Sequence, residues 1–492
     1  MTLTKFNIIV ALIALVLTVV IYLRKKKLDS WLMSYLQNFV GVFFIGSGLV
    51  KAVDPLGTSY KMMDYFAEFE STFSHIWFSF IAPIFPWFGQ HAVALSVGMI
   101  ILEVMLGITL ITGSMRKLTA WAFMFLIVLF TIMTGYTYLT GYVPEGVNFF
   151  EFSKWGPYVE TNMKVTDCGC FGDFMKLKPL TTFTKDVILL IPGLLFLFFT
   201  KKMHQLFTKP IRTGINIVAL AGLLWLCFSS FVWDIPAVDF RPFKVGVNIR
   251  DKKEAEEKAM SDVKVIAYKL TDKETGKTIE LPYADYLKRY KEFPKEKYTF
   301  EQVKTEPAIK PTKLSEFEAE NPEGENIAEE ILNDPNYHFM IVGYHLHGTP
   351  RQETVMKYDT IYRMDSTLVA DTIQMRPVID KIAKRQEVVT VYDWDEDYIA
   401  HWKETVIPVV HLAMDEGMNV RALVGAGWEQ IDSFKKATGA KFPFYFADDI
   451  MLKTIVRSNP GIVLMKDGKI LQKWHYKKLP HYEEIKNTWM KK

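Results

Sequence analysis

The hydrophobic positions divide the chain into an apolar first half and a polar second half. Six stretches of the first half are long and apolar enough to cross a bilayer, which takes roughly 17–25 residues. We expect spans at 6–23, 31–50, 93–112, 118–139, 187–200 and 215–233, with the fifth starting as early as Phe183. The pattern therefore predicts an α-helical membrane bundle of about six transmembrane helices.

Basic residues between these spans predict the orientation. Four follow the first span at 24–27, Arg116 and Lys117 follow the third, and Lys201 and Lys202 follow the fifth. Loops rich in Lys and Arg stay in the cytoplasm. We therefore expect the N-terminus, the loop between the fourth and fifth spans, and everything after Trp233 on the opposite side of the membrane.

The polar second half alternates short apolar runs with amphipathic stretches. Two runs at 263–270 and 278–281 predict a β-hairpin. Further on, we expect strands at 338–346, 420–425, 461–465 and 470–474, and helices at 398–417, 428–438 and 451–458. Helices alternating with strands, followed by a terminal hairpin, indicate an extracytoplasmic α/β layer fold. The Lys-, Glu- and Pro-rich stretch before it predicts a small β-rich linker module.

Charge and cysteine content narrow the classes of function. A net charge of +3 over 492 residues is too small to favour binding to nucleic acid. The chain has three cysteines, Cys168, Cys170 and Cys227, so the polar half carries no thiol. Cys227 lies in the sixth span, where a lone cysteine usually packs as a small hydrophobe. A relay from the loop cysteines to Cys227 is the alternative.

Cys168 and Cys170 flank Gly169 in the loop between the fourth and fifth spans. Outside the cytosol a cysteine pair can hold a disulfide. A disulfide between them would close a very small ring, which constrains the unfolded chain little and therefore adds little stability. We expect so small a ring to be strained, and strained disulfides are easily reduced, which favours an exchanging redox pair. A structural disulfide and a metal site remain alternatives, although the loop has no histidine to complete a metal site. Asp167 and Asp173 add negative charge, which disfavours a thiolate.

Glu103 near the middle of the third span is the other candidate functional residue. A carboxylate inside a membrane is costly and is by default a sign of function, here a proton relay or a contact to a quinone. The alternative is a protonated side chain that is hydrogen-bonded through Ser47 or Thr134. Lys51 and Asp54 are expected to end the second span as interfacial anchors.

His345 and His347 are two residues apart in a predicted strand, so their side chains are expected on one face. This is metal-ligand spacing, but no third ligand is apparent nearby in the sequence. We therefore expect two surface histidines and no metal site.

The first 235 or so residues resemble the DoxX family of small membrane proteins. The resemblance rests on 39–51, on Asp54-Pro55-Leu56-Gly57 and on Glu103. The loop from Cys168 to Asp173 is similar to that of the MauE-like branch, which is associated with methylamine utilisation. In that branch the membrane protein is implicated in thiol–disulfide chemistry beside a thioredoxin-like partner. The resemblance thus implies that Cys168 and Cys170 are the redox pair.

The last 155 or so residues resemble a thioredoxin fold of the TlpA-like kind. The matching features are the strand before Gly343, the Asn459-Pro460 step and the strand–Asp467-Gly468-Lys469–strand hairpin. The resemblance implies a cis proline beside a dithiol, and makes Pro460 a candidate peptide-binding residue. The chain departs from the family because the stretch 347–350, where a Cys-x-x-Cys is expected, contains no cysteine.

These observations predict a transmembrane domain at 1–235, a β-rich linker module at 236–330 and a cysteine-free thioredoxin-like domain at 331–492. We expect a multi-pass protein of a bacterial inner membrane, with its N-terminus and C-terminal domain in the periplasm. Its expected function is thiol–disulfide exchange with a periplasmic or envelope protein, with a quinone as candidate electron acceptor. The alternative is a non-enzymatic, membrane-anchored binding or assembly protein with a structural disulfide.

Overall fold

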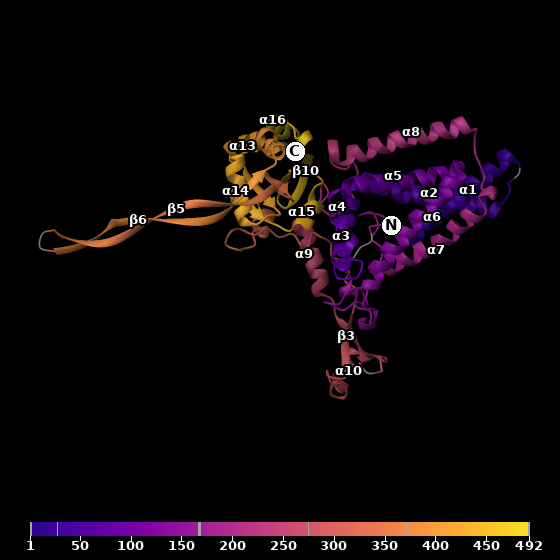
Figure 1. Ribbon diagram of the computed structural model, residues 1–492, viewed down its shortest axis with the longest axis horizontal. Helices are drawn as coiled ribbons and strands as arrows, with labels where there is room; N and C mark the ends of the chain where they lie inside the picture. Colours follow the sequence, from indigo (N-terminus) through magenta and orange to yellow (C-terminus); the bar gives the residue numbers. More distant parts are fainter. Residues whose placement is uncertain (1, 27, 166–168, 274, 370–371, 491–492) are drawn as a thin grey trace. The chain divides into compact units, whose positions relative to one another are not determined.

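The computed structural model describes residues 2–26, 28–165, 169–273, 275–369 and 372–490 (Figure 1). They form two compact units, Met1–Arg241 and Pro242–Lys492. The predicted separation of a linker module at 236–330 from a domain at 331–492 stays a prediction.

The first unit is helical. Its helices are α1 (Leu3–Lys25), α2 (Trp31–Val53), α3 (Pro55–Ser74), α4 (Ile84–Gln90), α5 (Ala92–Thr112), α6 (Arg116–Thr140), α7 (Pro179–Phe198) and α8 (Lys209–Phe228), the last continued by a π-helical turn, Ser229–Trp233. Within the described residues six helices are long and apolar enough to cross a membrane, namely α1, α2, α5, α6, α7 and α8 with its π-helical turn. The six predicted spans are confirmed as helices. The fifth begins at Pro179, ahead of both predicted starts, because a proline suits the first turn of a helix.

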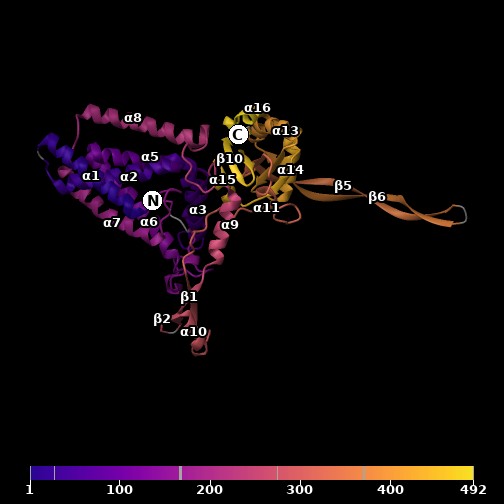
Figure 2. The same cartoon turned by 180° about the vertical axis from the view of Figure 1, so that it is seen from behind.

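Helix α2 is central to the bundle. It packs against α1 and α5, α6 packs against α7, and α8 lies along α5 (Figure 2). The backbones of α2 and α5 approach closely at two glycines, since a Cβ added to Gly107 would lie 2.6 Å from the carbonyl oxygen of Gly41. Close contact of this kind is the usual reason for small residues between membrane helices.

The segment between α2 and α5 is rich in aromatic residues and is largely helical, since it contains α3 and α4. Asp54 caps α3 by accepting a hydrogen bond from the backbone N–H of Gly57 at 3.2 Å. The hydroxyl groups of Tyr65 and Thr137 are 2.7 Å apart and join α3 to α6. Trp77, by contrast, is 90% exposed. Helix α3 thus packs on the bundle as a lid, while the turn after it exposes an aromatic side chain suited to a membrane interface.

The second unit combines helices with three sheets. Its helices are α9 (Ile249–Ser261), α10 (Tyr283–Arg289), α11 (Ala328–Leu332), α12 (Glu396–Ala400), α13 (Ile407–Asp415), α14 (Trp428–Thr438), α15 (Asp449–Ile455) and α16 (Tyr482–Ile485). Its strands are β1 (Val265–Asp272), β2 (Thr278–Pro282), β3 (Tyr298–Lys304), β4 (His338–Gly343), β5 (Gly348–Val369), β6 (Thr372–Trp394), β7 (Asn419–Val424), β8 (Phe444–Phe446), β9 (Gly461–Lys466) and β10 (Lys469–His475).

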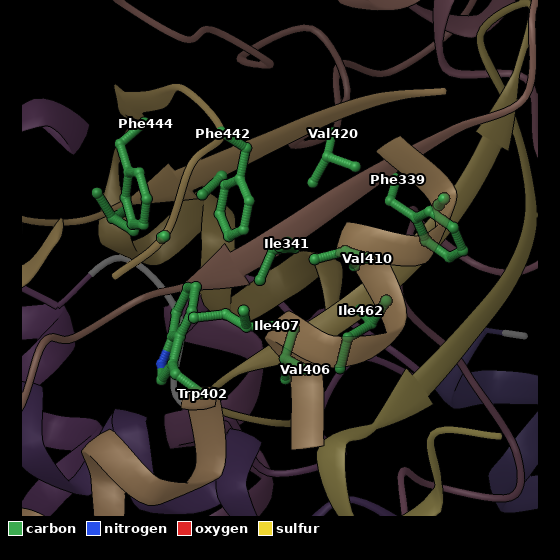
Figure 3. Packing of buried hydrophobic residues seen from close by; sticks show 14 of the residues in the cluster. Phe339, Ile341, Trp402, Val406, Ile407, Val410, Val420, Phe442, Phe444 and Ile462 are labelled. Carbon is green, nitrogen blue, oxygen red and sulfur yellow. The ribbon is translucent and has the colours of Figure 1, made fainter. Parts of the chain in front are cut away.

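The main sheet is mixed and has five strands in the order β10-β9-β4-β7-β8. Strands β4, β7 and β8 are parallel, whereas β9 and β10 are antiparallel to their neighbours. Apolar side chains on one face of this sheet pack against α13 and α14, and Trp402 is fully buried among them (Figure 3). The peptide bond between Asn459 and Pro460, just before β9, is cis. The predicted strands and helices of this region are confirmed, with ends that differ by a few residues.

The other two sheets are antiparallel. The predicted β1–β2 hairpin is confirmed, and β3 joins it on the other side in the order β2-β1-β3. Strands β5 and β6 pair with each other as a long two-stranded ribbon between β4 and α12 (Figure 1). We did not expect this ribbon from the sequence.

One prediction about the segment after β4 is wrong. His345 and His347 do not lie in a strand, since β4 ends at Gly343 and both follow it in a loop. Residues 347–350 lie at the start of the ribbon, because Gly348 begins β5, and the next helix starts only at Glu396. A strand–helix connection is interrupted here by the whole β5–β6 ribbon.

The close approach of α2 and α5 can be tested with two matched substitutions. Gly107→Ala places a Cβ 2.6 Å from a backbone oxygen and should destabilise the bundle by about 1–3 kcal/mol, the usual cost of overpacking. Gly98→Ala in the same helix meets no atom within 4 Å and should leave stability unchanged or slightly higher. Thermal unfolding of the purified protein in detergent measures both. Equal melting temperatures for the two variants would contradict this packing.

Candidate functional site

Two buried ion pairs lie inside the membrane unit. Lys51 from α2 and Glu103 from α5 are joined at 2.6 Å between Nζ and Oε2, with side chains 4% and 3% exposed. Lys185 and Asp186, both on α7, are joined at 2.5 Å between Nζ and Oδ1. A charge inside an apolar bundle is tolerated when it is paired, so each cation offsets the cost of burying a carboxylate.

The structure corrects two predictions about these residues. Lys51 is not an interfacial anchor, because it is buried against Glu103. Glu103 is hydrogen-bonded neither through Ser47 nor through Thr134, the partners that the sequence suggested. Ser47 donates to the carbonyl oxygen of Cys170 at 2.9 Å, and Thr134 donates to Asp186 at 3.1 Å. The charge of Glu103 is matched by a lysine instead.

The loop after α6 brings Cys170 to these charges. Phe171 is almost fully buried, with its ring centroid 5.2 Å from that of Phe6 and 5.8 Å from that of Phe43. This side chain holds the loop in the hydrophobic core of the bundle, while Ser47 holds the carbonyl oxygen of Cys170. Cys170 itself is half-buried, and Cys168 lies outside the described residues.

Lys185 connects Cys170 to the buried charges. Its Nζ lies 3.9 Å from Sγ of Cys170 and donates to Asp186. A cation beside a cysteine favours the thiolate, the form that acts as nucleophile. Asp173, expected to oppose a thiolate, has an ammonium of its own, that of Lys176, 3.9 Å away. The electrostatic surroundings of Cys170 are thus more favourable to a thiolate than the local sequence indicates.

A small cavity adjoins Cys170 and the Lys51–Glu103 pair. Its volume is about 40 Å³, and its lining includes Lys51, Tyr65, Thr134, Gly169 and Cys170. This is room for a few water molecules. The cavity is therefore suited to water molecules and protons near the sulfur. We refer to Lys51, Glu103, Thr134, Lys185 and Asp186 as the intramembrane polar cluster.

The sequence analysis did not identify Lys185 and Asp186. The signal was present, because the two charges follow Pro179 within a stretch that is otherwise apolar or hydroxylated. We expected the fifth span to start at Phe183 or Val187, which placed these residues at or near its end. Their role became apparent only when α7 was found to extend back to Pro179.

Cys227 lies apart from this site. It is fully buried in α8 among Ala52, Val97 and Ile100, in a hydrophobic cluster distinct from the one that holds Phe171. This environment agrees with the packing interpretation of Cys227 and gives no support to a relay.

The histidines and Pro460 lie together in the second unit. The rings of His345 and His347 are 4.9 Å apart, both residues are exposed as expected, and partial desolvation lowers the pKa of each below its ordinary value. No group of three potential metal ligands occurs among the described residues. Tyr398 donates to Asn459 at 3.0 Å, and the adjacent Pro460 is buried.

Comparisons of this chain with protein-family models, with curated proteins and with solved structures found no match.

The Lys51–Glu103 pair predicts a specific pattern of stability. Lys51→Met leaves a buried carboxylate without its cation and should destabilise the bundle by about 3–5 kcal/mol. The double substitution Lys51→Met with Glu103→Leu removes both charges and should recover most of that loss. Denaturant unfolding of the full chain in detergent micelles measures the three forms.

Lys61→Met is the control for this series. Lys61 pairs with Asp64 at 3.2 Å on α3, but the two side chains are 32% and 51% exposed, so its loss should cost less than about 1 kcal/mol. If Lys51→Met and Lys61→Met lowered the free energy of unfolding equally, the buried Lys51–Glu103 pair would contribute no more to stability than an exposed pair.

Proposed function

We propose that this chain is a multi-pass protein of a bacterial inner membrane that takes part in thiol–disulfide exchange through Cys168 and Cys170. The observation that carries the proposal is the position of Cys170. Its sulfur lies beside the ammonium of Lys185, and its loop is held against the intramembrane polar cluster by Ser47 and Phe171. A cysteine with a neighbouring cation and limited exposure is typical of a reactive thiol.

The exchange balances as follows when the loop starts as a disulfide. A thiolate of a partner protein attacks one loop sulfur, so that a mixed disulfide forms and the loop S–S bond breaks. The partner's second thiolate then attacks its own sulfur in the mixed disulfide, which leaves an oxidised partner and a loop dithiol. Two electrons have moved from the partner to the loop. A membrane quinone that accepted these two electrons and two protons would become a quinol, and the loop disulfide would be restored.

Glu103 and Lys51 are suited to a proton-handling role in this scheme. They lie inside the bundle at 2.6 Å, and Lys51 lines the cavity that Cys170 also lines. A paired carboxylate next to a water-sized space can accept a proton that leaves a thiol and pass it on. A quinone that served as electron acceptor would come from the bilayer.

We propose further that the sheet β10-β9-β4-β7-β8 belongs to a thioredoxin-like domain without a dithiol. The support is the strand order, with three parallel strands followed by an antiparallel β-hairpin at one edge, β9–β10. Helix α12, the first helix after β4, begins at Glu396 with Asp395 as its cap, and no cysteine is near that turn in the sequence. Such a domain docks partners and does not exchange disulfides. The loops rich in Lys and Arg are assigned to the cytoplasm, which places this domain and the cysteine loop on the opposite side, in the periplasm.

A second candidate function follows from the same absence of thiols in the second unit. The chain is then a non-enzymatic anchor for an envelope-binding domain, and the Cys168–Cys170 pair is a structural disulfide. The two functions differ in the behaviour of the loop thiols in living cells.

The thiol state of the loop distinguishes them. Cells are quenched with acid, and free thiols are tagged with a mass label in the native chain and in Cys168→Ser, Cys170→Ser and Cys227→Ser. If the loop exchanges disulfides, the native chain should be a mixture of reduced and oxidised forms. One of the two loop variants should also trap a mixed disulfide with a partner protein, which mass spectrometry then identifies. Cys227→Ser should behave as the native chain, because Cys227 is buried in another hydrophobic cluster. A fully oxidised loop that resists mild reductant and traps no protein would leave the anchor function.

The role of Lys185 has its own test. Lys185→Gln removes the ammonium beside Cys170 and should slow alkylation of the reduced loop at neutral pH about tenfold, the effect of roughly 1.4 kcal/mol on a rate. Lys185→Arg retains the charge and should restore most of the rate. Raising the pH should also restore it in Lys185→Gln, since hydroxide then supplies the thiolate. A rate that is the same in all three forms would remove Lys185 from the scheme.

A further inference from the structure

The β5–β6 ribbon has two chemically different faces. Directly opposed residues of an antiparallel pair lie on the same face, and alternate residues along a strand do so too, except in β6 where the register shifts between Lys381 and Ile379. Register pairs such as Tyr362 with Ile379 and Thr360 with Ile382 therefore assign each side chain to a face. On one face, which we call the apolar face, the register places seven large apolar side chains, with Thr360, Lys384 and Gln386 between them: Met356, Tyr358, Tyr362, Met364, Ile379, Ile382 and Val388.

The opposite, charged face is neutralised by its own cross-strand ion pairs. Arg351 lies 3.3 Å from Asp393, Lys357 lies 3.1 Å from Glu387, and Arg385 lies 2.9 Å from Asp359. Acidic and basic side chains thus alternate along the ribbon, and this face needs no partner to balance its charge. It is an ordinary solvated surface.

The apolar face is open to solvent in the single chain. Its seven side chains are between 49% and 63% exposed. Within the described part of the chain the ribbon is a sheet of two strands, 22 and 23 residues long. A two-stranded ribbon is at best marginally stable in water, and three or more strands or a covered apolar face are needed for stability. We therefore expect another surface to cover the apolar face when the protein is assembled.

We propose that the occupant is the apolar face of a second copy of this chain, so that two ribbons stack face to face. The exposed area of these side chains amounts to roughly 700 Å² per ribbon, if each has the area of a large side chain. Two stacked ribbons then bury about 1,400 Å², within the range of stable, specific interfaces. Sheets pack in this manner at a spacing of about 10 Å. The contact is isologous, as in most homodimers, since one patch meets its own copy.

The charge pattern argues against two other candidate occupants of the apolar face, a charged partner protein and a membrane surface. The apolar face carries no carboxylate among its described side chains, and its single ammonium, that of Lys384, lies 5.5 Å from the centre of the Tyr358 ring. A face of this kind offers a charged partner protein little to recognise. Segments that lie on a membrane surface typically carry an excess of basic side chains on their polar face, whereas here Arg351, Lys357 and Arg385 are paired with carboxylates.

The test is photo-cross-linking of the full chain in native membranes. Benzoylphenylalanine is introduced in place of Tyr362 on the apolar face or, as a control, in place of Arg363, its neighbour on the charged face, which is 66% exposed. The Tyr362 position should yield a cross-linked band at twice the mass of the chain, and the Arg363 position should not. Bands of equal strength from both positions, or none from either, would overturn the proposal.

A second pair of variants tests the same surface without a cross-linker. Ile382→Glu puts a charge on the apolar face and should abolish the Tyr362 cross-link, whereas Lys381→Glu on the charged face should leave it intact. Mass photometry of the detergent-purified chain should show the corresponding loss of dimer for Ile382→Glu alone. A cross-link from Tyr362 only to lipid or to a different protein would assign this face to that occupant instead and overturn the dimer.

Discussion

The pairing of Lys51 with Glu103 is the interaction on which the membrane unit depends. Burying either charge alone inside an apolar bundle would be strongly destabilising. At a separation of 2.6 Å the attraction between the two charges offsets much of the free energy lost when both leave water. The pair requires α2 and α5 to lie close together, and the glycines at Gly41 and Gly107 permit that approach. Packing and electrostatics thus constrain the same two helices, and Lys51 of this pair also lines the cavity beside Cys170.

A second ion pair, Lys185 with Asp186, extends this arrangement to the cysteine loop. Thr134 of α6 donates to Asp186, and Lys185 reaches the sulfur of Cys170, so that α6, α7 and the loop share one polar network. The loop is therefore not a solvent loop that happens to contain two cysteines. It is held by an aromatic anchor in the core and ends at a set of buried charges, which is the setting that proposed exchange chemistry requires.

The second unit shows a different balance between local pattern and context. The strands and helices of its main sheet are visible in the sequence because buried strands are short, uniformly apolar runs. The β5–β6 ribbon was missed although its strands alternate apolar and charged residues over much of their length, because the sequence lacks the glycine-marked turn by which hairpins are recognised. The same alternation, once the register is known, separates the apolar face from the charged one. Its insertion after β4 also explains why no helix follows His347 directly.

The sequence by itself determined the six membrane helices, the apolar strands of the main sheet and the absence of thiols from the second unit. These depend on local composition and period, which a single chain displays directly. It also singled out Cys170 and Glu103, since a cysteine pair and an intramembrane carboxylate are unusual in themselves. Only the tertiary structure decided that Glu103 meets Lys51, that Lys185 stands beside Cys170, and that the apolar residues of the ribbon share one face. Those contacts join residues far apart in sequence or depend on strand register, and local pattern carries no information about either.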